Sequence, residues 1–158
     1  MPVLITAGLS PEAYRLQRIL NVRDVVFADE SPLPQIPGIQ SVVLPACNSA
    51  SFVHETLKAC LDHRITRIYP LKWGEVAELA GARALFLEYH VGLMIPSNNW
   101  LNHKPNQISG ATDHVAVLEN GILIAGEFLP DNFPAKDETG AFGWATNGQQ
   151  MEYSLYLV

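Results

Sequence analysis

The first 96 residues alternate between apolar strand patterns and amphipathic helix patterns, and this alternation limits the possible folds most strongly. It begins with Val3-Leu4-Ile5, an uninterrupted apolar run typical of a strand that is covered on both faces. Ser10 can then cap a helix that has Pro11 at its first position. Such an order needs crossover connections, and it therefore predicts a mainly parallel sheet with helices on both faces.

The same alternation continues to residue 96. Further strands are expected at 24–29, 41–45, 65–71 and, in a shorter form, 93–95. Further helices are expected from Ser49 or Ser51 onward, at 73–80 and at 82–90. We expect a three-layer α/β domain with a short sheet in the strand order 3-2-1-4.

The pattern changes at Ser97, and we expect a β extension over 97–158 that packs on a domain formed by 1–96. Asn120-Gly121 suits a type I′ turn, so the surrounding residues predict an antiparallel hairpin. We expect an irregular polar chain at 97–113, a hairpin at 114–128, a long loop at 129–150 and a last strand at 151–158. We expect the last strand to pair on or near the hairpin.

Composition excludes several classes of protein. Hydrophobic residues make up 48% of the chain, which is enough for a core and argues against disorder. The net charge of -6 argues against sequence-independent binding of nucleic acid, which needs clustered basic residues. No apolar run approaches the roughly 20 residues that span a bilayer, and no signal peptide is visible. We therefore expect a cytoplasmic protein.

The two cysteines, Cys47 and Cys60, do not form a CxxC motif, and we interpret both as reduced thiols. Cys60 belongs to a helical pattern and is expected in the core. Cys47 follows a strand in a loop, where a reactive thiol is possible, although no neighbour in the sequence would clearly lower its pKa.

Five stretches of the first 96 residues together resemble a known domain: LITAG (4–8), VVFADESPLP (25–34), LPAC (44–47), FVHETLKACLDHRITRIYPL (52–71) and ARALFLEYHVGLMIP (82–96). They resemble the Rossmann-like pre-ATP-grasp domain that precedes the ATP-binding part of ATP-grasp ligases such as the carbamoyl-phosphate synthase large subunit. The resemblance implies that a full ATP-grasp domain should follow Pro96, whereas only a short extension follows here. This chain also has Leu71-Lys72-Trp73 where the family usually has Thr or Asp before an acidic helix.

The opening turn does not fit a dinucleotide. The fingerprint G-x-G-x-x-G brings the backbone close to a pyrophosphate, but residues 8–13 read G-L-S-P-E-A. Glu12 would place negative charge where a phosphate should lie. Asp29 stands at a spacing that suits a ribose contact, yet an acid there is also expected from the pre-ATP-grasp resemblance. We expect neither NAD nor FAD, and no other cofactor.

Candidate ligand-binding residues follow the strands, because ligands of open α/β sheets bind at the carboxyl ends of the strands. They are Gly8, Ser10, Asp29, Glu30, Cys47, Asn48, Lys72 and Trp73. Lys72 beside an aromatic residue at a helix start could hold a phosphate or a carboxylate. The alternative, which we favour, is a solvated lysine that flanks a packed tryptophan.

No catalytic or metal motif stands out. The five histidines have no ligand spacing, so we expect no metal site, and no Ser/His/Asp set is evident. Catalytic residues therefore remain unassigned. The aromatic extension, with Trp100, Trp144 and Tyr156 among its members, suggests either packing on the α/β domain or a homodimer interface.

These observations predict a free-standing pre-ATP-grasp-like domain that is accessory or binds a small ligand or a partner, rather than a catalyst by itself. The alternatives are one subunit of a split ligase whose ATP-grasp chain is separate, or a small nucleotide- or sugar-processing enzyme that uses Asp29 and Lys72.

Overall fold

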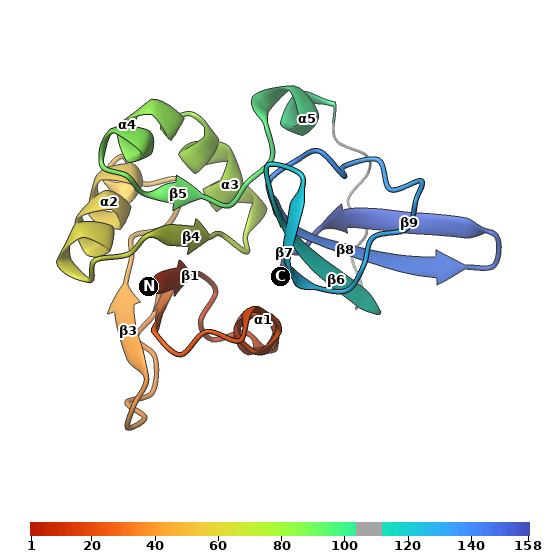
Figure 1. Ribbon diagram of the computed structural model, residues 1–158. Helices are drawn as coiled ribbons and strands as arrows, with labels where there is room; N and C mark the ends of the chain where they lie inside the picture. The colour runs from red at the N-terminus through yellow and green to blue at the C-terminus, as the bar shows by residue number, and fades with distance from the viewer. Residues whose placement is uncertain (104–111) are drawn as a thin grey trace. The chain divides into compact units, whose positions relative to one another are not determined.

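The computed structural model describes residues 1–103 and 112–158 (Figure 1). Contacts divide the chain into two compact units, Met1–Leu93 with Leu157–Val158, and Met94–Tyr156. Part of the stretch expected to be irregular, 104–111, lies outside the described residues. Among the described helices, none combines the length and the apolar composition that spanning a bilayer requires.

The first unit is built on a five-stranded parallel sheet in the order β3-β2-β1-β4-β5. Its strands are β1 (Val3–Ile5), β2 (Val25–Asp29), β3 (Gln40–Val43), β4 (Arg67–Tyr69) and β5 (Gly92–Leu93). The sheet confirms the predicted α/β class and the order 3-2-1-4, and β5 extends it beyond β4. β1 is entirely buried at the centre, whereas β3 forms a largely exposed edge.

Four helices cover this sheet: α1 (Pro11–Leu20), α2 (Phe52–Asp62), α3 (Trp73–Ala80) and α4 (Arg83–Glu88). In Figure 1, α1 lies on one side of the sheet and the other three helices lie on the opposite side. The Ser10 side chain accepts a hydrogen bond from the Ala13 N–H, and Pro11 opens α1, as the sequence predicts. The chain builds the sheet outward from β1 to β3 and then returns to the other side of β1 to form β4 and β5. Because crossovers of this kind are right-handed, helices formed before and after this reversal lie on opposite faces of the sheet.

The second unit contains α5 (Asn98–Asn102) and a four-stranded antiparallel sheet in the order β7-β6-β8-β9. The strands are β6 (His114–Glu119), β7 (Ile122–Gly126), β8 (Gly140–Asn147) and β9 (Gln150–Leu155). The hairpin prediction is confirmed, because β6 and β7 join at Asn120-Gly121. Both turn residues have positive φ angles, 50° and 77°, as a type I′ turn requires.

Two expectations for this unit were wrong. The supposed long loop 129–150 contains β8, and α5 interrupts the stretch expected to be irregular. The last strand lies near the hairpin as expected, because β9 pairs with β8, which pairs with β6 of the hairpin. Glycines at 140 and 143 made β8 resemble a loop. At Gly143, however, a Cβ atom would lie 2.5 Å from the Thr112 Cγ2, so the absence of a side chain reflects close packing.

The chain returns to the first unit at its last two residues. Val158 donates its backbone N–H to the Leu71 carbonyl at 2.8 Å. Leu71 follows β4 and is buried, so this hydrogen bond lies next to the carboxyl edge of the parallel sheet.

Candidate functional site

Asp29 ends β2 and is the centre of a polar cluster at the carboxyl edge of the parallel sheet. Its Oδ2 accepts the Leu9 N–H at 3.1 Å, and its Oδ1 accepts the Glu30 N–H at 2.8 Å. The Lys72 Nζ donates to the same Oδ1 at 3.2 Å. Segments that follow β1, β2 and β4 therefore meet at one carboxylate.

The backbone after β1 reaches Asp29 through a tight turn. Ala7 has a φ of 53°, in the left-handed region, and the Gly8 N–H donates to the Ala28 carbonyl at 2.9 Å. A Cβ atom on Gly8 would lie 2.8 Å from the Leu33 Cδ2 and 2.9 Å from the Phe27 Cβ. Gly8 is therefore needed for close packing of the turn on β2, which is a reason other than phosphate binding.

Lys72 forms ion pairs with two acids. Its Nζ lies 3.2 Å from the Asp29 Oδ1 and 3.7 Å from the Glu30 Oε1. Burial by itself would lower the pKa of Lys72, but the hydrogen bond and the charge of Asp29 outweigh it and raise the pKa. Lys72 is accordingly a cation that is already paired.

The pKa of Asp29 is shifted downward, opposite to that of Lys72. Burial would raise its pKa, but the hydrogen bonds from Leu9, Glu30 and Lys72 outweigh burial and lower it. A carboxylate with three donors is held ionised, so it is a poor candidate for a general base.

Glu75 lies behind this ion pair and is only 4% exposed. The Thr6 hydroxyl donates to its Oε2, while the Thr6 Oγ1 accepts the Leu71 N–H at 2.8 Å. Burial raises the pKa of Glu75, and hydrogen bonds from Thr6 and from the Lys72 backbone oppose the rise. Glu75 is the third residue of α3, so it reaches back to the N-cap residue as in a capping box.

Sequence reasoning missed Thr6 and Glu75. The spacing of Glu75 from the start of α3 was an available signal, because a capping box needs Glu or Gln at this position. No sequence signal identified Thr6, whose role depends on β1 and β4 being neighbours.

The structure places the other predicted site residues, Ser10, Cys47, Asn48 and Trp73, in surroundings of their own, apart from the Asp29–Lys72 ion pair. The Ser10 hydroxyl donates to the Ala7 carbonyl at 2.7 Å and caps α1. Cys47 packs against α3, because a Cβ atom on Gly74 would lie 2.5 Å from the Cys47 Sγ. Asn48 is exposed in the turn after β3, and Trp73 is the half-buried first residue of α3. The structure therefore joins Asp29, Glu30 and Lys72 directly and places Gly8 beside them.

The cluster is rich in carboxyl groups. One ammonium group faces Asp29 and Glu30, with Glu75 buried behind it. Within residues 1–103 and 112–158, no group of three or more His, Cys, Asp or Glu side chains is placed to hold a metal ion. Because two carboxylates face a single ammonium group, the edge suits a ligand that carries positive charge better than it suits a polyphosphate.

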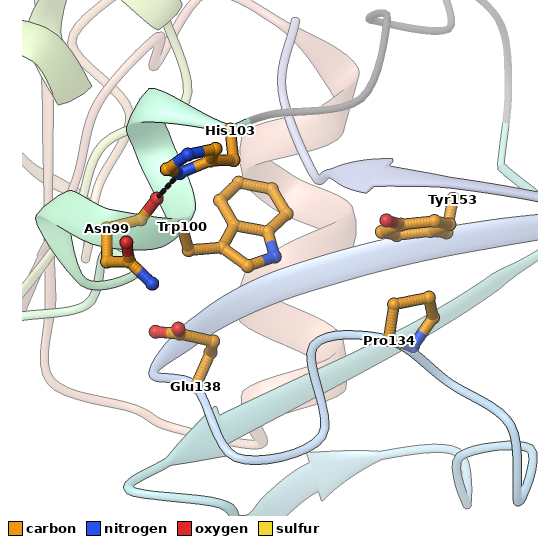
Figure 2. Close-up of a pocket in the computed structure, with 6 residues that line it drawn as sticks. All are labelled: Asn99, Trp100, His103, Pro134, Glu138 and Tyr153. Atoms are coloured by element: carbon orange, nitrogen blue, oxygen red, sulfur yellow. Dashed lines mark hydrogen bonds between the residues drawn. The ribbon is translucent and has the colours of Figure 1, made fainter.

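A pocket of about 570 Å³ lies in the second unit. Its lining residues are Asn99, Trp100, His103, Pro134, Glu138 and Tyr153. Figure 2 shows the Trp100 indole, the Tyr153 ring and the Glu138 carboxyl around the same hollow. The sequence had indicated only that this part of the chain is aromatic.

Comparison with protein-family models gave no match for this chain, and comparison with curated proteins gave none either.

Proposed function

We propose that the chain contains a pre-ATP-grasp-like domain that binds a small zwitterion, such as an amino acid, at the carboxyl edge of its parallel sheet. The observation that carries the proposal is the Lys72–Asp29 ion pair beside β1 and β4. These two strands flank the point where the chain changes direction across the sheet, which is where open α/β folds bind ligands.

The charges of the cluster favour a zwitterion. Of the three N–H groups of Lys72, one donates to Asp29 and another can face Glu30 at 3.7 Å, which leaves one for a ligand carboxylate. The Glu30 side chain is 44% exposed and can receive a ligand ammonium group. A nucleotide phosphate would have to approach Asp29 and Glu30 as well as Lys72, and their charges oppose it.

Thermal unfolding with panels of amino acids, nucleotides and sugar phosphates tests the proposal. A ligand specific to the native state raises the melting temperature. We expect an amino acid to do so in the natural chain and in Lys58→Gln, which removes an exposed lysine of α2, but not in Lys72→Gln. A phosphate ligand, or an equal shift in both variants, would contradict the proposal.

A second candidate is that the chain is one subunit of a split ligase. The resemblance of 1–96 to the pre-ATP-grasp domain supports this candidate, and a separate chain would then supply the ATP-grasp domain. Residues 97–158 contain seven acids against two lysines and no arginine, a composition poorly suited to holding a triphosphate. We expect no magnesium-dependent ATP turnover from the purified chain alone. Turnover that is lost in Lys72→Ala would instead favour an enzyme.

A homodimer that uses the second unit is a further proposal. Ile122 and Ile124 share the outward side of β7 and are 68% and 40% exposed, and Phe128 just beyond is 90% exposed. Exposed apolar side chains on a sheet edge favour association. Light scattering should give a dimer mass for the natural chain and a monomer mass for Ile124→Lys. An unchanged monomer in both would contradict the dimer.

A further inference from the structure

The pocket of the second unit has aromatic walls that are held in place from behind. Trp100 packs edge-to-face on Phe142, with ring centroids 5.7 Å apart. Tyr153 packs in the same way on Phe133 at 5.4 Å, and the two phenylalanines pack on each other at 5.9 Å. Phe133 and Phe142 are 2% and 0% exposed. The half-buried Trp100 and Tyr153 are thus fixed by a buried aromatic pair, which lowers the entropy lost when a ligand binds.

Glu138 supplies a fixed carboxylate to this pocket. Its two oxygens accept the backbone N–H and the hydroxyl of Ser97, both at 2.8 Å. A carboxylate has about four acceptor positions, so these bonds hold it in place and leave acceptor capacity for a ligand. Among the residues that the structure describes, no basic side chain forms an ion pair with Glu138.

His103 adds another acceptor. Its Nδ1 lies 2.9 Å from the Asn99 carbonyl, which can only accept, so Nδ1 carries the proton (Figure 2). In the neutral ring, Nε2 then has a free lone pair. The surrounding part of the chain is negatively charged, as Glu138 is, since residues 97–158 carry seven acids against two lysines.

From this arrangement we propose that the pocket binds an alkylated ammonium group. Two aromatic rings, one carboxylate and a lone pair all favour positive charge, and a cation on the face of Trp or Tyr is attracted by the ring quadrupole. The volume of about 570 Å³ falls within the range of small-molecule sites and exceeds what one such group needs. This site belongs to the second unit and does not depend on the zwitterion proposed for the first.

The test compares a cation with its neutral isostere. Choline and 3,3-dimethyl-1-butanol have nearly the same shape, and only choline is charged. We expect choline, but not the alcohol, to shift the indole N–H resonance of Trp100 in a two-dimensional NMR spectrum, assigned with Trp100→Phe. Equal shifts with both probes, or no shift with choline, would overturn the proposal.

Matched variants test the pocket residues. Glu138→Gln should weaken choline binding at least about tenfold, whereas Glu152→Gln should change it less than about twofold. Glu152 precedes Tyr153 on β9, so its side chain points to the other face of the strand. If Glu138→Gln fails to fold, Tyr153→Leu removes one ring but keeps the carboxylate, and it should also weaken binding at least about tenfold. Unchanged binding in a folded Glu138→Gln or Tyr153→Leu would overturn the proposal.

A second arm identifies the source of the ammonium group. A peptide with one trimethyllysine is titrated beside choline, with the unmodified peptide as control. Tighter binding of the modified peptide than of choline would assign the site to a methylated protein, and the reverse would assign it to a free metabolite. Equal binding of modified and unmodified peptide, without binding of choline, would contradict the site.

Discussion

Thr6 and Glu75 are separated by 69 positions in the sequence, yet the Thr6 hydroxyl donates directly to the Glu75 carboxyl. Thr6 also accepts the Leu71 N–H at 2.8 Å. This hydrogen-bonded chain connects the end of β1 with the segment that leads into α3, and so it positions Lys72 beside Asp29.

Removal of the Glu75 carboxyl should destabilise the first unit. Glu75→Ala leaves the buried Thr6 hydroxyl and the Lys72 N–H without their acceptor, which costs about 1–3 kcal/mol for each unsatisfied buried group. Glu75→Gln keeps an acceptor at the same position and should be much less harmful. Urea unfolding of both variants measures the difference. Equal stability of Glu75→Ala and the natural chain would contradict this role.

Asp29 and Glu75 should give the stability opposite dependences on pH. The pKa of Asp29 is lowered on folding, so its contribution is present above the unfolded value of about 4 and is lost as the pH falls through the folded pKa. The pKa of Glu75 is raised, so its ionisation destabilises the fold increasingly as the pH rises above about 4.3.

Two variants separate these effects. The stability advantage of the natural chain over Asp29→Asn should shrink toward acid pH. The stability of Glu75→Gln relative to the natural chain should improve from acid to neutral pH. Urea unfolding between about pH 3 and pH 8 measures both trends. Trends of the same sign would refute the assignment of these two carboxyls.

The two thiols should differ strongly in reactivity. Burial raises the pKa of Cys60 to about 12, so almost no thiolate forms at neutral pH. Cys47 is only partly buried, in the loop that packs on Gly74. A thiol-reactive dye should modify one cysteine in the folded protein and two after denaturation, and Cys47→Ser should abolish the first reaction. Rapid labelling of the folded Cys47→Ser protein would contradict the prediction.

Gly126 should be irreplaceable for the end of the β6–β7 hairpin. Its φ is 88°, and a Cβ atom would lie 2.3 Å from the Val115 carbonyl oxygen, which is a backbone atom that cannot move aside cheaply. Gly148 has a φ of 64° but no atom within 4 Å of its Cβ position, so it serves as the matched control. Gly148→Ala should cost about 1 kcal/mol and Gly126→Ala clearly more. Similar melting temperatures for the two variants would contradict the clash.

The sheet of the first unit could be predicted because its central strands are buried on both faces. Val3-Leu4-Ile5 shows this as an unbroken apolar run. β8 could not be predicted, because its glycines at 140 and 143 resemble loop residues. Gly140 has a φ of 139°, which favours glycine, and a Cβ atom on Gly143 would lie 2.5 Å from the Thr112 Cγ2. Local patterns report burial along one strand, and they do not report which backbone approaches closely.

The Asp29–Lys72 cluster and the aromatic pocket of the second unit likewise differ in how far the sequence predicts them. Asp29 and Lys72 could be predicted to meet, since both follow parallel strands and therefore lie at one edge. Trp100, Glu138 and Tyr153 come from a helix, a loop and a strand that are far apart in sequence. Their meeting depends on the packing of Phe133 and Phe142, for which one sequence offers no periodic signal.

The hydrogen bond from Val158 to Leu71 has a consequence for the order of events during synthesis. A ribosome makes the chain from residue 1 onward, so β1, β4 and Lys72 are all available long before Val158 exists. The Leu71 carbonyl therefore lacks its native partner until the whole second unit has been translated. The carboxyl edge beside Lys72 can therefore reach its native hydrogen bonding only after the second unit has been made.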